Sequence, residues 1–467
     1  MNFTTDQSLQ LEIDNQLENF RKNEYEVSKD VALSIIKKIP NHILSWKILG
    51  VIYSNTGQSD EALIASQEVL KLAPQDPESH NNLGVVLFRL SKLEEAEKSY
   101  NKAIELKPDY AEAYNNLADV LKDFGKIEAA VKNYKKAIEL KQDYVVAHYQ
   151  LGIMLQQLGK LEEAKKSYNK AIELKPDYAE AYTNLANTFK ELGKLDQAEK
   201  SYNKAIQLKP NFAVTYLNMG IFLKEIGKTD EAIKYFEKTI KIDPQDKLGA
   251  NLELACLGKR KIPTKTPTNY MKNFYKVKSK TWSNLETNKY FGRDLIEDAF
   301  KQTHTKQKKI NILDLGCGTG GLARFLHSYA NTLTGLDFSK EMLNEAKKTG
   351  FYDSLLNKRL EEYLSETSIY YDSIVAAAVM IHFLDLESVF ELINERLKLN
   401  GKFIFSVFES NKNDKELNSF LMYSHSDDYI TRLAENSKFK ITYRQKDVHE
   451  YHKKVAINAI IYVLQKS

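Results

Sequence analysis

The sequence predicts a multidomain chain in which an all-α superhelix of repeated helix pairs precedes an α/β domain that closes with an antiparallel hairpin. Three observations predict this fold class. The first half of the chain repeats at a fixed period, the second half places a glycine-rich turn between two apolar runs, and two β-rich runs lie near the end. A chain of 467 residues is also too long for one typical hydrophobic core.

Prolines and turn-forming residues mark the repeat, which has a period of 34 residues. Joint prolines occur at Pro40, Pro74, Pro108, Pro176, Pro210 and Pro244, and Gln142 fills the remaining slot. One turn-former recurs in each repeat, at Gly57, Ser91, Gly125, Gly159, Gly193 and Gly227. The pattern therefore predicts two helices in each repeat. A tight turn separates the two helices, and the proline marks the boundary with the next repeat.

This pattern resembles the tetratricopeptide repeat. The matching residues are Trp46, Leu49, Gly50, Tyr53, Ala62 and Pro74, with Ser66 where an aromatic residue is usual. The resemblance implies six repeats over residues 40–243. Residues 1–39 keep the repeat length but little of its pattern, so we expect degenerate capping helices there. Residues 244–268 are expected to supply a last capping helix and a basic linker.

One position of the inner helices carries amide side chains at the same spacing. Its members are Asn82, Asn116, Gln150, Asn184 and Asn218. An amide both donates and accepts hydrogen bonds, so it can pair with any peptide unit. The set resembles the asparagine ladder in the repeats of O-linked N-acetylglucosamine transferases, which implies a protein or peptide partner on the concave face. The alternative is that these amides link neighbouring repeats.

Strand and helix patterns alternate over residues 269–467. Buried parallel strands are predicted at 310–315, 332–337, 372–378 and 402–407, with a weak strand at 356–360. The β-rich runs 440–446 and 456–464, which a polar stretch separates, are predicted to form the terminal antiparallel pair.

A nucleoside pocket is predicted where the first two strands end. The first strand leads into a turn with glycine at positions 316, 318 and 320, where a side chain would block the approach of a ligand to the backbone. The next strand ends in Asp337, whose carboxylate can accept two hydrogen bonds from a ribose diol. The alternative is a plain tight turn in which Asp337 only caps the following helix. Gly316, Gly318 and Gly321 also fit the dinucleotide-binding pattern.

The run Leu313–Gly320, LDLGCGTG, is similar to the first motif of class I S-adenosylmethionine-dependent methyltransferases. The resemblance covers roughly residues 269–467 and implies a Rossmann-like fold, S-adenosyl-L-methionine as cofactor and methyl transfer to an O, N, S or C nucleophile. The implied cofactor-binding residues are Asp314, Gly316, Cys317, Gly318, Gly320, Asp337, Phe338, Met342 and Glu361. The whole layout resembles predicted bacterial methyltransferases that contain tetratricopeptide repeats.

Two histidines are candidate general bases for the acceptor, His382 and His425, and for each the alternative is a packing role. Tyr270, Tyr275 and Trp282 lie on an amphipathic stretch that in this fold often covers the cofactor; alternatively they are core aromatics. Cys317 suits the turn as a small residue, and no Cys/His cluster predicts a metal site.

The composition excludes several classes of function. A net charge of +4 and Lys/Glu runs on solvated helix faces do not indicate nucleic acid, and no apolar run of about 18 residues predicts a membrane span. Two cysteines and the lack of a signal-peptide pattern favour the cytoplasm.

We therefore expect an S-adenosylmethionine-dependent methyltransferase whose repeats recruit a protein partner or substrate. Two alternatives remain open: an interaction scaffold whose α/β domain binds the cofactor without turnover, and a nicotinamide-dependent oxidoreductase. The acceptor and the oligomeric state stay open at the level of sequence.

Overall fold

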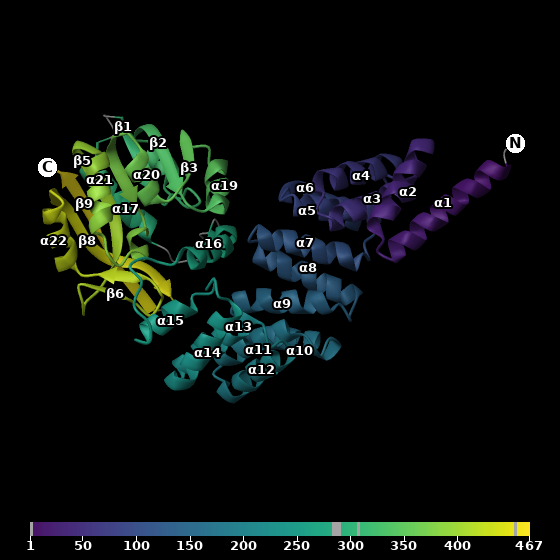
Figure 1. Ribbon diagram of the computed structural model, residues 1–467, viewed down its shortest axis with the longest axis horizontal. Coiled ribbons are helices and arrows are strands. Elements are labelled where there is room, and N and C mark those ends of the chain that lie inside the picture. Colours follow the sequence, from purple (N-terminus) through teal and green to yellow (C-terminus); the bar gives the residue numbers. More distant parts are fainter. Residues whose placement is uncertain (1–2, 283–290, 306–308, 453–454) are drawn as a thin grey trace. The chain divides into compact units, whose positions relative to one another are not determined.

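The computed structural model describes residues 3–282, 291–305, 309–452 and 455–467. The chain divides into two compact units, Met1–Pro210 and Asn211–Ser467. The first unit is all helical, and the second contains further helices and the sheet (Figure 1).

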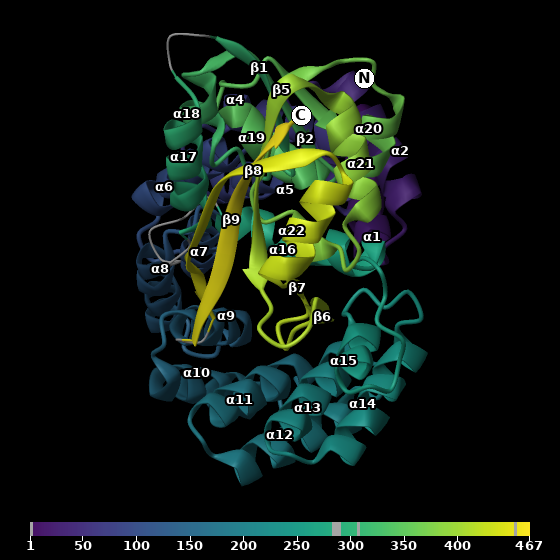
Figure 2. The same cartoon turned by 90° about the vertical axis from the view of Figure 1, so that its left-hand side faces the viewer.

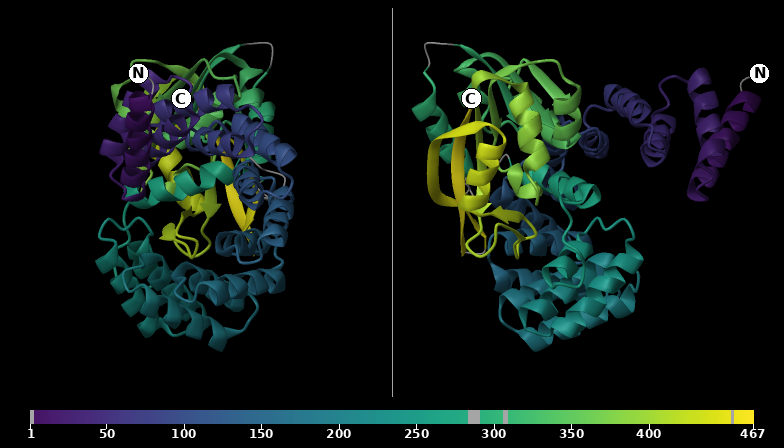
Figure 3. Two further views of the ribbon diagram at one scale, coloured as in Figure 1. Left: turned by 90° about the vertical axis from the view of Figure 1, so that its right-hand side faces the viewer. Right: turned by 60° about the vertical axis from the view of Figure 1, so that its left-hand side comes forward.

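The first unit consists of helices that pack against their neighbours in the chain (Figures 1 and 3). It begins with α1 (Phe3–Arg21) and α2 (Tyr25–Lys38) in the segment predicted to cap the array. The helix pairs of the repeats are α3 (Ile43–Asn55) with α4 (Ser59–Leu72), α5 (Pro77–Arg89) with α6 (Leu93–Leu106), α7 (Ala111–Asp123) with α8 (Ile127–Leu140), α9 (Val145–Gln157) with α10 (Leu161–Leu174), and α11 (Ala179–Glu191) with α12 (Leu195–Leu208).

The turn inside each helix pair adopts the left-handed conformation that the sequence predicts. All six turn-formers have positive φ, between 58° at Ser91 and 83° at Gly227. Within a repeat, the aromatic residue of the second helix packs on a small residue of the first. Tyr100 lies so close to Gly84 that a Cβ on this glycine would come within 2.6 Å of the ring. Small and aromatic residues therefore set how closely the two helices approach.

The second unit starts with a sixth helix pair, α13 (Ala213–Glu225) and α14 (Thr229–Ile242), and with α15 (Ala250–Cys256). Then come α16 (Thr268–Trp282) and α17 (Gly292–Thr303). The segment between α15 and α16, which the sequence predicts as a linker, is bonded to the α/β part. Pro263 O accepts from the Tyr423 hydroxyl at 2.7 Å, and Thr264 O accepts from Leu384 N at 2.8 Å.

Nine strands form one mixed sheet, in the described part of this unit. Their bounds are β1 (Ile310–Leu315), β2 (Ala330–Asp337), β3 (Ser354–Asn357), β4 (Tyr371–Ala376), β5 (Leu397–Glu409), β6 (Lys415–Leu417), β7 (Tyr423–His425), β8 (Phe439–His452) and β9 (Val455–Lys466). The order is β3-β2-β1-β4-β5-β7-β6, and the first five strands run parallel. β9 pairs antiparallel with both β5 and β8, so the predicted terminal pair is confirmed (Figure 2).

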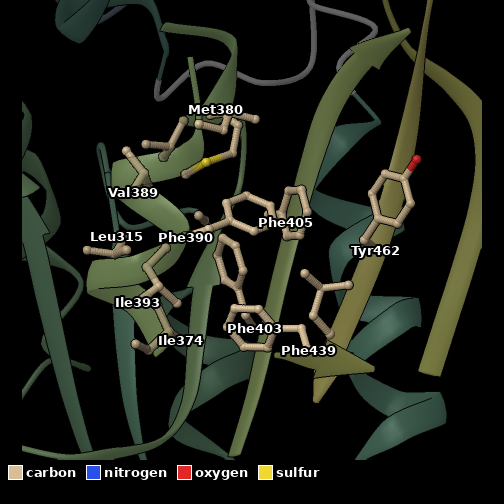
Figure 4. Packing of buried hydrophobic residues seen from close by; sticks show 14 of the residues in the cluster. Leu315, Ile374, Met380, Val389, Phe390, Ile393, Phe403, Phe405, Phe439 and Tyr462 are labelled. Atoms are coloured by element: carbon tan, nitrogen blue, oxygen red, sulfur yellow. The ribbon is translucent and has the colours of Figure 1, made fainter. Parts of the chain in front are cut away.

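Helices cover both faces of the sheet. The shorter ones are α18 (Ala323–His327), α19 (Lys340–Lys348), α20 (Leu360–Glu366), the 3-10 turn η1 (Met380–His382), α21 (Glu387–Arg396) and α22 (Asp427–Asn436). Alternate residues of β5 enter different cores: Phe403 and Phe405 join one cluster and Ile404 joins the other. Phe390 of α21 packs edge-on against both phenylalanines, with ring centroids 5.6 and 5.4 Å away (Figure 4). A sheet buried on both faces matches the apolar strands of the sequence.

No helix within the described ranges combines the length and the apolar character that a membrane span requires.

Candidate active site

The glycine turn after β1 has a backbone that only glycine adopts without strain. Gly316, Gly318 and Gly320 have φ values of 65°, 54° and 83°. Space is also short, because a Cβ on Gly316 would come within 2.5 Å of Val379 Cγ2. The turn is thus held by the loop that follows β4 as well as by its own conformation.

A cavity of about 600 Å³ lies beside this turn, where β1, β2 and β4 end. Most of the predicted site residues line it: Asp314, Gly316, Cys317, Gly318, Asp337, Phe338, Met342, Glu361 and His382. Gly320 and His425 are not among its lining residues. The carboxyl ends of parallel strands are where open α/β sheets bind ligands, so the cavity is a candidate active site.

Asp337 is buried at the end of β2 and bonded to backbone N–H groups. Oδ2 accepts from Gly318 N at 3.0 Å, and Oδ1 accepts from Ser339 N at 2.8 Å. Burial raises the pKa of Asp337 to about 6, which these hydrogen bonds partly oppose. A carboxylate offers about four lone-pair positions, so beyond its backbone hydrogen bonds Asp337 can still accept from a ligand in the cavity.

Asp314 is buried at the end of β1. Its Oδ2 accepts a hydrogen bond from the Tyr352 hydroxyl at 2.7 Å. Burial raises the pKa of Asp314 to about 7, and the nearby Asp337 acts in the same direction. A cation in the cavity would favour the ionised form of this carboxyl group.

The surroundings of two further predicted residues, Cys317 and Glu361, define the protonation of the first and the ion pair of the second. Burial, together with Asp314 and Asp337, raises the pKa of the Cys317 thiol well above its ordinary value, so this thiol is protonated and poorly nucleophilic. Glu361 lies in the first turn of α20 and forms an ion pair of 3.1 Å with Lys265. Its carboxylate lines the cavity from the side of β3.

α16 forms one wall of the cavity, as expected for the amphipathic segment ahead of the first strand. Tyr275 lines the cavity, with its ring 5.8 Å from that of Phe338 in an edge-on arrangement. Tyr270 instead packs on Gly249, where a Cβ would lie 2.7 Å from its ring. The side chain of Trp282 lies outside the described residues.

His382 connects α16 to the loop after β4 through hydrogen bonds. Its Nε2 shares a hydrogen bond of 2.6 Å with the Tyr275 hydroxyl, and its Nδ1 one of 3.2 Å with Thr266 Oγ1. Burial lowers its pKa to about 4, so the ring is neutral. Both ring nitrogens are engaged within the protein, which favours the packing role for this histidine.

His425 is fully buried in β7. Its Nε2 donates to Leu384 O at 3.2 Å, and its ring stacks on Tyr429 with centroids 5.6 Å apart. Burial lowers its pKa to about 4. Because it does not line the cavity, the geometry again favours the packing alternative.

Sequence reasoning missed several residues that line the cavity, foremost His449 of β8. Its imidazole is 1% exposed, and burial lowers its pKa to about 4. Arg293, at the start of α17, lines the same cavity near Gly321. The signal for His449 was weak, because it lies in the polar stretch after the predicted strand 440–446, whereas β8 continues to His452.

The amide ladder lies on inner helices, and all five members are half-buried. Asn116 donates to Asn81 Oδ1 at 3.0 Å, and Asn184 donates to the Tyr149 hydroxyl at 3.0 Å. Each of these bonds joins one repeat to the preceding one. For these two members the structure therefore shows the linking contact that was the alternative interpretation.

Among the residues that the structure describes, no group of three His, Cys, Asp or Glu side chains is placed to hold a metal ion.

Comparison with family models defines the class of protein. Residues 285–440 match a methyltransferase domain. Tetratricopeptide repeat models match residues 45–76, 75–143, 133–166, 154–193, 179–212 and 213–246. The chain thus carries tetratricopeptide repeats followed by a methyltransferase domain, as the two resemblances implied.

Among curated proteins, the chain is similar to the "Ubiquinone biosynthesis O-methyltransferase" of Citrobacter koseri and of Salmonella enteritidis. Each is 31% identical over 127 residues, which cover 26% of this chain and 50% of the relative. The chain thus spans about half the length of the curated relatives it matches.

Among solved structures, the repeats are similar to MamA, at 28% identity and a TM-score of 0.33, covering 35% of this chain and 96% of MamA. A tetratricopeptide repeat protein from Parabacteroides merdae gives 20% identity and a TM-score of 0.41, covering 50% of this chain and 93% of that protein.

Proposed function

We propose that this protein is an S-adenosyl-L-methionine-dependent methyltransferase whose repeats recruit a protein partner or substrate. One observation carries the proposal: the glycine turn, Asp337 and the aromatic wall of α16 line a single cavity at the carboxyl ends of the strands. The match of residues 285–440 to a methyltransferase domain supports the same reaction.

The residues around the cavity fit the parts of this cofactor. Asp337 would accept hydrogen bonds from the ribose hydroxyls, while Phe338 and Met342 offer apolar surface for the adenine. Asp314 and Arg293 carry charges that suit the amino and carboxylate groups of the methionine part. Bound there, the cofactor supplies a methyl group that its sulfonium already activates.

The protein's own task is to align an acceptor and to exclude water. The hydrogen bond between Tyr275 and His382 joins α16 to the loop after β4, and both residues line the cavity. The relatives named as O-methyltransferases support an oxygen acceptor, and a hydroxyl acceptor needs a base.

Calorimetry with S-adenosylhomocysteine and, separately, with NAD tests the cofactor. We expect binding of the first and none of the second; the reverse result would identify a nicotinamide enzyme. Transfer of label from methyl-labelled cofactor to an acceptor then separates an enzyme from a scaffold that only binds. Binding without transfer to any component of a cell extract would support the scaffold alternative.

For the repeats, we propose that the amides of the ladder that keep no inter-repeat bond pair with a partner peptide. Asn82→Ala with Gln150→Ala is the informative variant, because Asn116 and Asn184 already bond within the array. Mass spectrometry of captured proteins should show partners that the variant loses and an Asn116→Ala control retains. Equal capture by all three forms would remove the ladder from the interface. A cytoplasmic location remains a prediction, which cell fractionation tests.

A further inference from the structure

We propose that a cavity in the first repeat receives an aromatic side chain, phenylalanine or tyrosine, from the peptide that the repeats recruit, and that an acidic residue stands next to this aromatic residue. The inference rests on the proposed recruitment of a protein partner. It adds the place and the side chain through which that partner is anchored.

The first repeat lacks a ring that the later repeats have. At one position of the second helix, the later repeats carry an aromatic side chain that is at most 2% exposed: Tyr100, Tyr134, Tyr168, Tyr202 and Phe236. Ser66 occupies the same position in α4. A serine side chain is much smaller than a phenol ring, so the first repeat loses most of the volume that its equivalents fill.

The space of the missing ring stays open. In three later repeats, a Cβ on the glycine of the first helix would lie 2.6 Å from the ring, at Gly84, Gly152 and Gly220. On Gly50, the nearest atom to such a Cβ is Ser66 Oγ, at 3.5 Å. Gly50 and Ser66 therefore face a space that the equivalent residues do not have.

A cavity of about 190 Å³ occupies this position, and α3, α4 and α5 line it. Its lining residues Gly50, Ser66 and Val69 are buried, whereas Val51 and Arg89 are exposed, so the cavity opens to solvent at Val51 and Arg89. An apolar cavity of about 150 Å³ binds benzene, so the volume in this protein suffices for one aromatic ring.

The walls of the cavity suit a flat ring. Its apolar lining residues are Trp46, Val51, Val69, Val85 and Val86. Trp46 Nε1 donates to Pro40 O at 2.8 Å, which fixes the orientation of the indole, and valine side chains have few rotamers. An entering aromatic side chain buries a large area and has only two rotatable bonds to immobilise, so it gains more here than a flexible aliphatic one.

The cavity adjoins the amide ladder. Asn82, the ladder member of the second repeat, lines the cavity and is half-buried. Its amide can donate to and accept from a peptide unit. A partner residue whose ring enters the cavity therefore has its own backbone beside Asn82, so the ladder and the cavity act on one stretch of peptide.

The charges at the cavity favour an acidic residue next to the aromatic one. Lys47 is already paired with Asp76, at 2.8 Å. Arg89 is exposed, and its Nη1 donates to Ser54 O at 2.6 Å. A guanidinium group has five N–H donors, so Arg89 can bind a carboxylate of the partner as well.

The first test is equilibrium dialysis of the full chain against p-cresol, which is the side chain of tyrosine without its backbone. Ser66→Tyr restores the ring of the later repeats and should fill the cavity. The wild type should therefore bind one more molecule of p-cresol than Ser66→Tyr does. Gln67→Tyr is the matched control, because it adds the same ring at an exposed position of α4 and should bind as the wild type does. Equal binding by the wild type and Ser66→Tyr would overturn the cavity as the site.

A gain of binding guards against a variant that misfolds. The ring of Tyr168 fills the space next to Gly152, so Tyr168→Ser gives the fourth repeat the arrangement of the first. This variant should bind one more molecule of p-cresol than the wild type, which misfolding does not explain. An unchanged number would show that loss of the ring creates no site and would overturn the inference.

A peptide series tests the side chain and the charge. The probes are acetylated, amidated hexapeptides Ala-Ala-X-Glu-Ala-Ala that carry a fluorophore, with X as Phe, Tyr, Leu or Ala. By fluorescence anisotropy, the Phe and Tyr peptides should bind the wild type roughly tenfold more tightly than the Leu and Ala peptides, and Ser66→Tyr should lose this preference. Equal affinities for Phe and Leu would overturn the aromatic anchor. Replacing Glu by Gln in the Phe peptide should weaken binding by about twofold or more at low salt, and an unchanged affinity would overturn the acidic neighbour.

Failure of this inference is distinguishable from failure of the proposed function. If Ser66→Tyr still captures the partners that Asn82→Ala with Gln150→Ala loses, the anchor is overturned and recruitment by the repeats stands. If the wild type captures no partner and binds none of the peptides, recruitment and the anchor both fail. Methyl transfer is measured separately, because none of these experiments contains the cofactor.

Discussion

Two buried carboxyl groups, Asp314 and Asp337, stand at the ends of the neighbouring strands β1 and β2. Burial raises the pKa of both, to about 7 and about 6. Burying two carboxyl groups side by side does not stabilise the fold, because each ionised group loses its favourable hydration free energy. A bound cation would offset that lost free energy, so the pair suits a ligand that carries a positive charge and hydroxyl groups.

Replacement of Asp337 tests its role in binding. Asp337→Ala should weaken the binding of S-adenosylhomocysteine more than tenfold, equivalent to about 1.4 kcal/mol or more, because the ribose loses its acceptor. Calorimetry measures this, and thermal unfolding reports separately on the lost bonds to Gly318 and Ser339. Asp353→Asn is the control, since the Asp353 carboxylate accepts from Leu333 N of β2 at 2.7 Å and does not line the cavity. An unchanged affinity in Asp337→Ala would remove Asp337 from the site.

Asp314 gives the unfolding free energy a predictable pH dependence. The folded state holds its proton up to a pH of about 7, whereas the unfolded state releases it near 3.9. The folded state therefore binds more protons in between, and the free energy of unfolding falls as the pH rises from about 4 to about 7. Asp337 acts in the same direction up to about pH 6.

Asp314→Asn should flatten this slope and make the ligand-free protein more stable than the wild type at pH 8 but not at pH 4. Asparagine keeps an oxygen for the Tyr352 hydroxyl and adds no charge. Denaturant unfolding of both proteins at the two pH values measures the effect. Parallel curves would show that the buried charge of Asp314 is not its source.

The glycine turn could be predicted from a short stretch of sequence. Its positive φ angles and close contacts require glycine at positions that lie next to one another in the chain. Local sequence was silent about Tyr352, whose hydroxyl reaches Asp314 from 38 residues away. His449 was missed for a similar reason: its orientation depends on a bulge, which is a property of the pairing with β9 and not of β8 alone. Contacts between distant segments thus explain most of the gap at the site.

At the scale of the element, Ser91 is the exception among the turns that join the paired helices. It adopts φ 58°, where its Cβ is strained, while the five equivalent positions are glycine. Ser91→Gly should therefore stabilise the protein by about 0.5–1 kcal/mol, after allowance for the greater freedom of glycine in the unfolded chain. Denaturant titration of the full chain measures this, and Gly125→Ser should show the opposite sign. Destabilisation by Ser91→Gly would contradict the assignment of strain.

Strand prediction was most reliable where both sheet faces are buried. β1, β2, β4 and β5 lie where their continuous apolar runs indicate. β3 ends at Asn357, so residues 358–360 of the predicted weak strand fall outside it, and Leu360 begins α20. β8 extends beyond its predicted end. The polar residues after position 446 predicted the end of the strand, but the exposed face of a hairpin accepts polar residues.

Within the second unit, the segment from α15 to α16 is fixed at both ends. Asn269 donates to Gln245 O at 3.2 Å and Asn273 to Lys247 O at 3.1 Å, which joins α16 to the chain before α15. Further along, Thr266 N donates to His382 O at 2.8 Å. The segment between these helices therefore behaves as part of the α/β fold, and the domain limits 244–268 and 269–467 remain predictions.

A truncation series tests those limits. A chain that starts at residue 269 should unfold at a lower temperature than one that starts at residue 258, because the shorter form lacks the bonds to Leu384 N, His382 O and Tyr423. Calorimetric unfolding of the two fragments provides the comparison. Equal midpoints would show that residue 269 is a true domain boundary.

The attachment of α16 to the chain before α15 has an evolutionary consequence. Because α16 also lines the cavity, an insertion or deletion between Ile242 and Ala250 would shift one wall of the candidate active site. Relatives that keep this attachment should therefore vary little in the length of the loop after α14.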